Sequence, residues 1–172
     1  MHIPLHLNME NLIGHGGNSC VFAASTGQWV FKLFKSSNHT DFCNDPIPDR
    51  ILRQLYESEL EAYTLVSEHP EVVAHVPSFG GPMSVASVTN TAGVDITSMF
   101  LVDCCLKLGR IEGREAKLSN LVDHHVHLRD FCRRLHELGV LFYHDASVFD
   151  PGDSSKFVVF DFRTREILDQ AI

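Results

Sequence analysis

Apolar and polar residues alternate along the first third of the chain, and this pattern predicts β-strands. Residues 11–35 hold two apolar runs that meet at Thr26-Gly27, and a glycine-rich break, GHGGN, comes before them. Turn residues between apolar runs are typical of antiparallel hairpins. The polar stretch 36–49, which contains two prolines, is expected to be a loop.

Two segments repeat apolar residues at steps of three and four, which predicts amphipathic helices. The first helix is expected over 50–68, ending before His69-Pro70. The second is expected over 119–139, with Ser119 as its N-cap and Gly139 at its C-terminal end. The apolar face of the second helix consists of Leu121, Val122, Leu128, Phe131, Cys132, Leu135 and Leu138.

The rest of the chain is expected to form strands and one connector. Segments 76–89 and 94–106 each predict a strand, with a turn between them. The charged stretch 109–117, GRIEGREAK, is the candidate boundary between two small lobes. Residues 143–162 predict a β-hairpin around Pro151-Gly152. The predicted order is therefore β-β-α-β-β, connector, α and hairpin, an α+β chain.

Length and charge restrict the class of protein. A chain of 172 residues with 44% hydrophobic residues predicts one globular domain with its own core. The formal net charge of −8 argues against nucleic acid and anionic membranes as main partners. No run of eighteen apolar residues and no secretory signal peptide is visible, which favours a cytosolic protein.

The cysteines and histidines predict no zinc site. The five cysteines show no CxxC spacing, so reduced thiols fit better than a metal or redox pair. In the HHVH cluster, His124 and His127 would share one side of a helix and could bind a metal. No Cys or acidic ligand stands beside them, so a solvated face is the preferred interpretation.

Three features of the first 60 residues suggest phosphate chemistry. Gly14, Gly16 and Gly17 lie between two strands, where backbone N–H groups could approach phosphates without interference from side chains. Lys32 follows in the strand WVFK, and a lysine turned inward there would need a carboxylate partner. Glu59 shares the apolar stripe of the first helix and offers that carboxylate.

These residues, in this order, resemble the protein-kinase fold. The run Gly14-x-Gly16-x-x-Ser19-x-Val21 is similar to the kinase glycine-rich loop, with Ser19 in place of the third glycine. WVFK resembles the V-A-I-K strand, which implies that Lys32 holds the α- and β-phosphates of ATP and that Glu59 is its ion-pair partner.

The second half of the chain continues the resemblance. MFLVDCCL is similar to the hinge strand, which implies that the backbone from Asp103 to Cys105 faces adenine. LHELGVLFYHD resembles the run that ends in H-R-D, so Asp145 is the candidate catalytic base. VVFDF resembles the strand that ends in D-F-G, so Asp161 is the candidate Mg²⁺ ligand.

The chain departs from the kinase pattern at several positions. Tyr143 and His144 replace the His and Arg of H-R-D, which suggests no control by a phosphorylated activation loop. The second metal ligand is either Asp150, by counting from Asp145, or Ser147, if the loop is shortened. Arg163 stands at the D-F-G glycine, where it either helps to neutralise phosphate or faces solvent.

The largest departure is the end of the chain. Eleven residues follow Asp161, which leaves no room for an activation segment or a peptide-docking lobe. This pattern resembles the minimal type III effector kinases that pathogenic bacteria inject into host cells, virulence proteins delivered without a cleaved signal peptide. The resemblance implies a bilobal fold with an N-lobe over 1–103 and a hinge and reduced helical C-lobe over 104–172.

The expected function is therefore that of an ATP- and Mg²⁺-dependent kinase acting on a Ser or Thr hydroxyl of a protein. One family of such effectors phosphorylates a host heat-shock chaperone, which makes a host chaperone one candidate substrate. A pseudokinase that binds nucleotide and serves as an interaction module is a second reading, because the second metal ligand is not obvious. A small-molecule phosphotransferase of the aminoglycoside type is a third.

Overall fold

The computed structural model describes residues 4–112, 114–117, 126–141, 147–150 and 157–165. The fold is mixed α+β, built on an antiparallel five-stranded sheet with few helices, which confirms the predicted α+β class. The strands are β1 (Leu5–Asn8), β2 (Leu12–His15), β3 (Ser19–Ala23), β4 (Trp29–Lys35), β5 (Phe79–Met83), β6 (Val85–Thr89), β7 (Phe100–Gly109), β8 (Arg114–Lys117), β9 (Ser147–Asp150) and β10 (Val158–Val159). The α-helices are α1 (Asp49–Ser67), α2 (Pro70–Val73) and α4 (Val126–Glu137), and the short 3-10 helices are η1 (Met9–Asn11), η2 (Thr40–Phe42) and η3 (Thr97–Met99).

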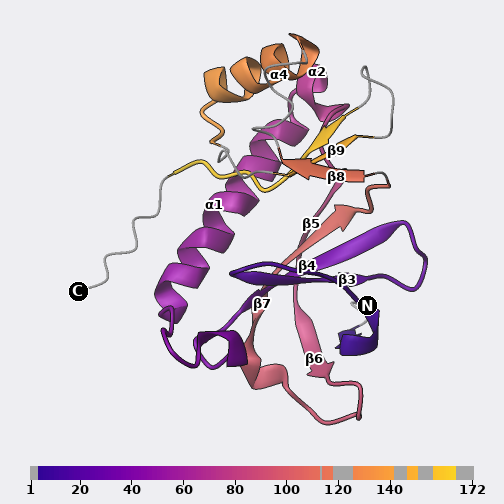
Figure 1. The fold of residues 1–172 in the computed structure, drawn as a ribbon, viewed down its shortest axis with the longest axis vertical. Helices are drawn as coiled ribbons and strands as arrows, with labels where there is room; N and C mark the ends of the chain where they lie inside the picture. Colours follow the sequence, from indigo (N-terminus) through magenta and orange to yellow (C-terminus); the bar gives the residue numbers. More distant parts are fainter. Residues whose placement is uncertain (1–3, 113, 118–125, 142–146, 151–156, 166–172) are drawn as a thin grey trace. The chain divides into compact units, whose positions relative to one another are not determined.

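The chain forms two compact units. One unit comprises Met1–Glu57 and Gly80–Arg110, and the other comprises Ser58–Phe79 and Ile111–Leu168. One division between them falls at Arg110, inside the charged connector. The other falls inside α1, which Figure 1 shows as a single unbroken helix, so α1 contributes to both units.

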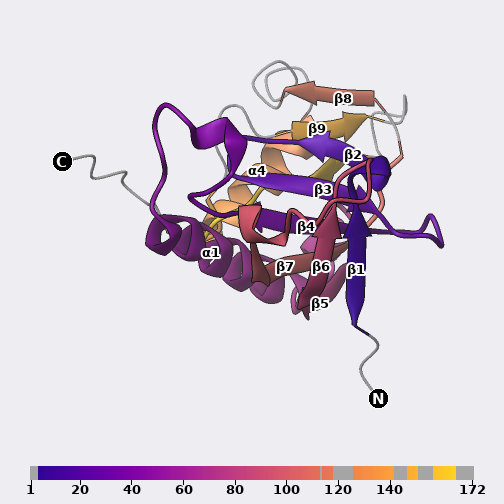
Figure 2. The same ribbon diagram turned by 90° about the horizontal axis from the view of Figure 1, so that it is seen from below.

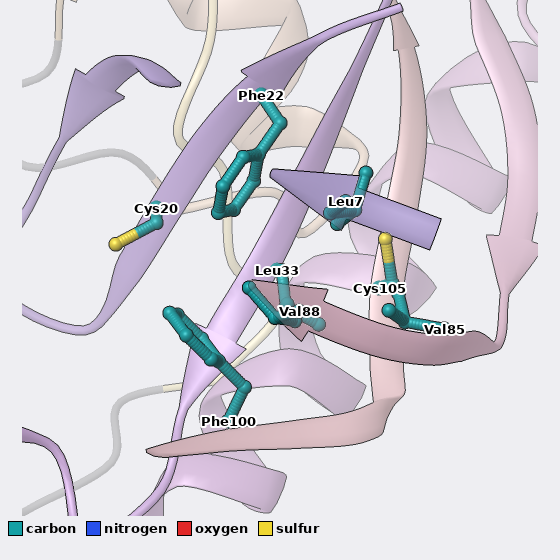
Figure 3. Packing of buried hydrophobic residues seen from close by; sticks show 8 residues of the cluster. All are labelled: Leu7, Cys20, Phe22, Leu33, Val85, Val88, Phe100 and Cys105. Atoms are coloured by element: carbon teal, nitrogen blue, oxygen red, sulfur yellow. The ribbon is translucent and has the colours of Figure 1, made fainter. Parts of the chain in front are cut away.

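The five-stranded sheet of the first unit has the order β2-β3-β4-β7-β5. The two-stranded pair of β1 and β6, seen side by side in Figure 2, contributes to the same core. The buried cluster combines one residue of β1, two of β6 and five from β3, β4 and β7: Leu7, Val85, Val88, Cys20, Phe22, Leu33, Phe100 and Cys105 (Figure 3). Apolar burial on this face of the sheet therefore stabilises the unit.

The second unit contains the small sheet β10-β9-β8 and helix α4. The residues of α4 that are buried, Leu128, Phe131, Cys132 and Leu135, belong to the predicted apolar face. Gly139 has φ +77°, and the backbone N–H of Val140 donates to the Leu135 carbonyl at 2.9 Å. The predicted C-terminal glycine is confirmed, because this left-handed conformation carries no steric cost at glycine.

Several predicted elements are confirmed and others need correction. The first helix lies at 49–67 against a prediction of 50–68, and β9 pairs with β10 as the predicted hairpin. The prediction of a single strand over 76–89 was wrong, because that stretch forms β5 and β6 in different sheets. The charged connector was not predicted to contain a strand, but its end forms β8, which pairs with β9.

No helix in the described part of the chain combines the length and the apolar character needed to cross a bilayer.

Candidate functional site

A row of register partners crosses the sheet of the first unit and contains Lys32. Gly14 of β2 is opposite Val21 of β3, Val21 is opposite Lys32 of β4, and Lys32 is opposite Leu106 of β7. Because register partners in antiparallel strands project to the same face, these residues share one face of the sheet. The glycine strand and the lysine strand are thus aligned, with one strand between them.

Helix α1 covers this face with its first half. The Tyr56 ring meets the Phe34 ring edge-on, with 5.5 Å between centroids. The Arg53 guanidinium donates to the Asp103 carboxylate at 2.6 Å and to the Cys104 sulfur at 3.4 Å. Phe34 lies two residues after Lys32 on the same face, and the Lys32 ammonium is 5.9 Å from the centre of its ring. Lys32 is therefore half-buried on the helix-covered side.

The glycine turn between β2 and β3 is held by a second lysine, Lys35. Its side chain is fully buried at the end of β4, and its ammonium donates to the Gly16 carbonyl at 2.5 Å and the Gly17 carbonyl at 3.3 Å. The Lys35 backbone N–H also donates to the Asn18 carbonyl at 3.0 Å, and Gly16 N–H donates to the Ser19 carbonyl at 2.9 Å. The turn is therefore fixed from inside the fold.

Asp41 of η2 supplies the counter-charge to Lys35. Its carboxylate is 2.5 Å from the Lys35 ammonium and 2.7 Å from His15 Nε2. The hydrogen bond from Lys35 lowers the pKa of Asp41 below its usual 3.8. The buried His39 ring lies beside this pair, and the Asp41 backbone N–H donates to its Nδ1 at 3.2 Å. Burial lowers the pKa of His39, so the neutral ring is favoured.

In the second unit, Asp161 adopts an unusual backbone conformation. Its φ is +68°, a left-handed value that no other non-glycine residue shows in the described ranges. Such conformations cost free energy and cluster at functional sites. Burial raises the pKa of the Tyr63 hydroxyl far above its usual value, and the charges of Glu59 and Asp161 raise it further. The charges of two of the predicted acidic residues therefore act on the same hydroxyl.

The segment that follows Asp161 is attached to α1. The backbone N–H groups of Thr164 and Arg165 donate to the buried Ser58 hydroxyl oxygen at 3.0 and 3.2 Å. The Thr164 hydroxyl donates to the Glu61 carboxylate at 2.6 Å. The Phe162 ring is fully buried and meets Tyr63 edge-on, with 5.5 Å between centroids. The chain that follows Asp161 is therefore attached to α1 through hydrogen bonds and an aromatic contact.

A backbone bridge links the segments that carry the two predicted aspartates. Leu141 N–H donates to the Arg163 carbonyl at 2.6 Å, and Arg163 N–H donates to the Leu141 carbonyl at 2.9 Å. Leu141 precedes Asp145 by four positions, and Arg163 follows Asp161 by two. Asp145 itself lies outside the described residues. The strand β9 begins at Ser147 and ends at Asp150, whose backbone is opposite Arg114 of β8.

The predicted adenine contact falls on residues in the interior of the sheet. Asp103 and Cys105 lie within β7, which is flanked by β4 and β5 and continues to Gly109. Cys105 is opposite Leu33, and its side chain is part of the buried core. The main chain at Cys105 is paired with Leu33 of β4. The predicted start of the hinge, residue 104, therefore lies inside strand β7. Burial raises the pKa of the Cys105 thiol to about 12, so this sulfur is not a nucleophile.

Sequence reasoning did not find Lys35, Asp41, His15 or His39 as a group. One signal was present, because Lys35 continues the alternation of Trp29, Phe31 and Leu33 along β4 and so falls on an apolar face. A buried ammonium must have acceptors. Nothing in the polar loop 36–49 indicates which of its acids supplies one, since that contact depends on how the loop folds back.

Among the residues that the structure describes, no three His, Cys, Asp or Glu side chains gather as a metal cage. Mg²⁺ at phosphate-transfer sites is commonly held by one or two carboxylates together with the phosphates themselves, so such a cage is not a requirement. A scan against protein-family models and a search of curated proteins find no match for this chain. Its function must therefore be inferred from its residues and their geometry.

Proposed function

We propose that the protein is an ATP- and Mg²⁺-dependent kinase that transfers the γ-phosphate to a Ser or Thr hydroxyl of another protein, on a minimal kinase-like fold of two lobes. The observation that carries the proposal is the row from Gly14 through Val21 to Lys32 on the face that α1 covers. In kinases the residues that hold ATP follow the same order along the chain: a glycine-rich hairpin, a lysine on the next strand and an acid on the helix that follows.

In this proposal the glycine turn and Lys32 bind the phosphates of ATP. Gly16 and Gly17 are exposed, and Gly17 has open space around its Cα. Ser19 and Val21 follow on β3, where Val21 shares the face of Lys32. Glu59 is assigned as the ion-pair partner of Lys32; it lies one helical turn after Tyr56 on α1. An acid that is only 5% exposed requires a charged or hydrogen-bonding partner.

Asp161 is assigned to Mg²⁺. Asp161 is exposed, and its left-handed backbone is a strained conformation of the kind that clusters at functional sites. Bound Mg²⁺ would neutralise charge on the β- and γ-phosphates. Asp150 or Ser147 is the candidate second ligand. Asp145 is assigned as the base that orients the acceptor hydroxyl and takes its proton.

The proposed acceptor is a protein. The chain resembles effector kinases with a reduced C-lobe, so a host protein such as a heat-shock chaperone is the first candidate, in the host cytoplasm. The net charge of −8 disfavours nucleic acid as a partner.

The test is phosphate transfer from labelled ATP to proteins of a host lysate, with Mg²⁺. Lys32→Ala, Asp145→Ala and Asp161→Ala are each expected to lower the rate by about a hundredfold or more, because catalysis depends on positioning and charge neutralisation. Lys107→Ala is the matched control, since Lys107 lies on β7 opposite Phe31 and so on the other face of the sheet. Melting temperatures establish that each variant is folded.

Wild-type activity in folded Lys32→Ala or Asp161→Ala would refute the assigned roles. ATP binding by the wild-type protein without any transfer would favour the pseudokinase reading instead. Transfer to a small-molecule hydroxyl in the absence of protein would favour the third reading.

A further inference from the structure

The buried Lys35 ammonium has a complete set of acceptors around the glycine turn. An ammonium carries three protons, and three oxygen acceptors surround it: the Gly16 carbonyl, the Gly17 carbonyl and the Asp41 carboxylate, with His15 Nε2 farther away at 3.5 Å. Its nitrogen is also 5.8 Å from the centre of the Phe42 ring. A buried charge with this many partners is costly to disturb, because losing one partner leaves polar groups unpaired.

These contacts fix the direction of two peptide groups. In a trans peptide the carbonyl and the following N–H point in opposite directions, and no described peptide bond is cis. Because the carbonyls of Gly16 and Gly17 point at Lys35, the N–H groups of Gly17 and Asn18 point away from it. Neither N–H has an acceptor among the described residues. The turn therefore presents two successive donors, an arrangement that binds anions in other proteins.

The surroundings agree with a role in presenting these donors. Gly16 and Gly17 are exposed, whereas Lys35 directly beneath them is not. The Asp41 carboxylate contacts the Lys35 ammonium below the turn and also His15, the residue that comes directly before the turn. Glycine would otherwise allow these peptides to rotate freely. The buried ion pair thus restrains a turn in which glycine by itself restricts the backbone little.

We propose that Lys35 is a positioning residue which, with Asp41 as counter-ion, orients the N–H groups of Gly17 and Asn18 as donors to the phosphate oxygens of a nucleoside triphosphate. This inference rests on the proposed function, and it assigns a different task to each lysine of β4. Lys32 contacts phosphate directly, and Lys35 acts through the turn.

The experiment compares binding of Mg·ATP with binding of adenosine, which lacks the phosphates, by calorimetry. Lys35→Met is expected to weaken Mg·ATP by about tenfold or more and to change adenosine by less than about twofold. Asp41→Asn, which keeps the shape of the side chain but removes its charge, is expected to shift Mg·ATP in the same direction. Lys107→Met is the control for loss of a lysine from the same sheet, and it is expected to bind both ligands as the wild type does.

Hydrogen exchange at Gly16, whose N–H donates to the Ser19 carbonyl at 2.9 Å, gives a second measurement that needs no nucleotide. Faster exchange in Lys35→Met and Asp41→Asn, with a melting temperature that shows a folded protein, supports the anchor. If Lys35→Met does not fold, Asp41→Asn decides the question, because the Asp41 side chain is 34% exposed and tolerates change better.

Unchanged Mg·ATP affinity in the folded variants would overturn the inference, as would an equal loss of ATP and adenosine, which indicates general damage. A wild-type protein that binds neither ligand refutes the proposed function, and with it the phosphate as the ligand of the turn. In that case hydrogen exchange at the Gly16 N–H still supports or refutes the role of Lys35 in holding the turn.

Discussion

At the scale of single residues, burial decides which ionisable groups have special properties. Lys35 and Lys32 are three positions apart on one strand, yet Lys35 is fully buried and Lys32 is half-exposed on the other face. The difference follows from strand alternation combined with the irregular pairing between Leu33 and Lys35. The carboxylate of Asp41 and the ring of His39 gather around the buried lysine because an isolated ammonium could not be accommodated there.

His39 predicts how stability depends on pH. Burial lowers its folded pKa below 6.5, so on acidification the unfolded chain takes up a proton before the folded chain does. The contribution of His39 to the free energy of unfolding is therefore fully present above pH 6.5 and is lost as the pH falls through the folded pKa of His39. In His39→Asn the free energy of unfolding, from denaturant titrations between pH 7.5 and about pH 5, is expected to vary less with pH than in the wild type.

The control is His136→Asn, which replaces an exposed histidine of α4. It is expected to keep the pH dependence of the wild type. An unchanged slope in His39→Asn would show that another group controls acid sensitivity.

At the scale of elements, α1 organises both units. Its first half covers the face of the sheet that carries Lys32, through Tyr56 and Arg53. Its second half holds the segment that follows Asp161, through the Ser58 hydroxyl. The amphipathic pattern predicts the helix and its apolar stripe. It does not predict that the hydroxyl oxygen of Ser58, a serine on this stripe, accepts hydrogen bonds from the backbone N–H groups of Thr164 and Arg165.

Ser58→Ala is expected to destabilise the protein by about 1–3 kcal/mol, because two backbone N–H groups lose their acceptor. Hydrogen exchange at Thr164 and Arg165 is expected to accelerate with it. Denaturant unfolding and exchange mass spectrometry measure the two effects. Ser67→Ala is the matched control near the end of the same helix, since the exposed Ser67 hydroxyl only donates to the Thr64 carbonyl. Equal stability of the two variants would contradict the anchoring role of Ser58.

At the scale of the whole molecule, the two compact units share one helix. The boundary between them passes from Glu57 to Ser58 within α1. A local break of the helix at that point is therefore expected to affect both units, whereas a break inside one unit's loops would not.

Glu57→Pro tests this dependence, because proline removes a helix hydrogen bond and costs about 3 kcal/mol or more. Glu57 is exposed, so Glu57→Ala serves as the control and is expected to leave stability nearly unchanged. Trp29 fluorescence reports on the first unit, and hydrogen exchange at 158–165 reports on the second. Loss of stability in only one of them would show that the units do not depend on α1 together.

Much of the local structure could be predicted from the sequence. The first helix, the glycine hairpin, the hairpin of β9 and β10 and the glycine cap at Gly139 follow from periodicity and turn residues. The candidate residues Gly14, Val21 and Lys32 were predicted as a motif, and the register of three strands explains how such a motif becomes a row. The pairing of β1 with β6 could not be predicted, since Leu5 and Val85 are eighty residues apart and no local pattern indicates parallel pairing at that distance.

The sequence by itself determined the first helix and the glycine hairpin, because burial of one face repeats at a period that neighbouring residues reveal. Only the tertiary structure decided the contacts of Lys35 with the glycine turn and with Asp41, and the left-handed backbone at Asp161. The physical reason is that these contacts depend on loops and on strand register, where the free energy of a buried charge or a strained peptide is set by groups distant in the chain.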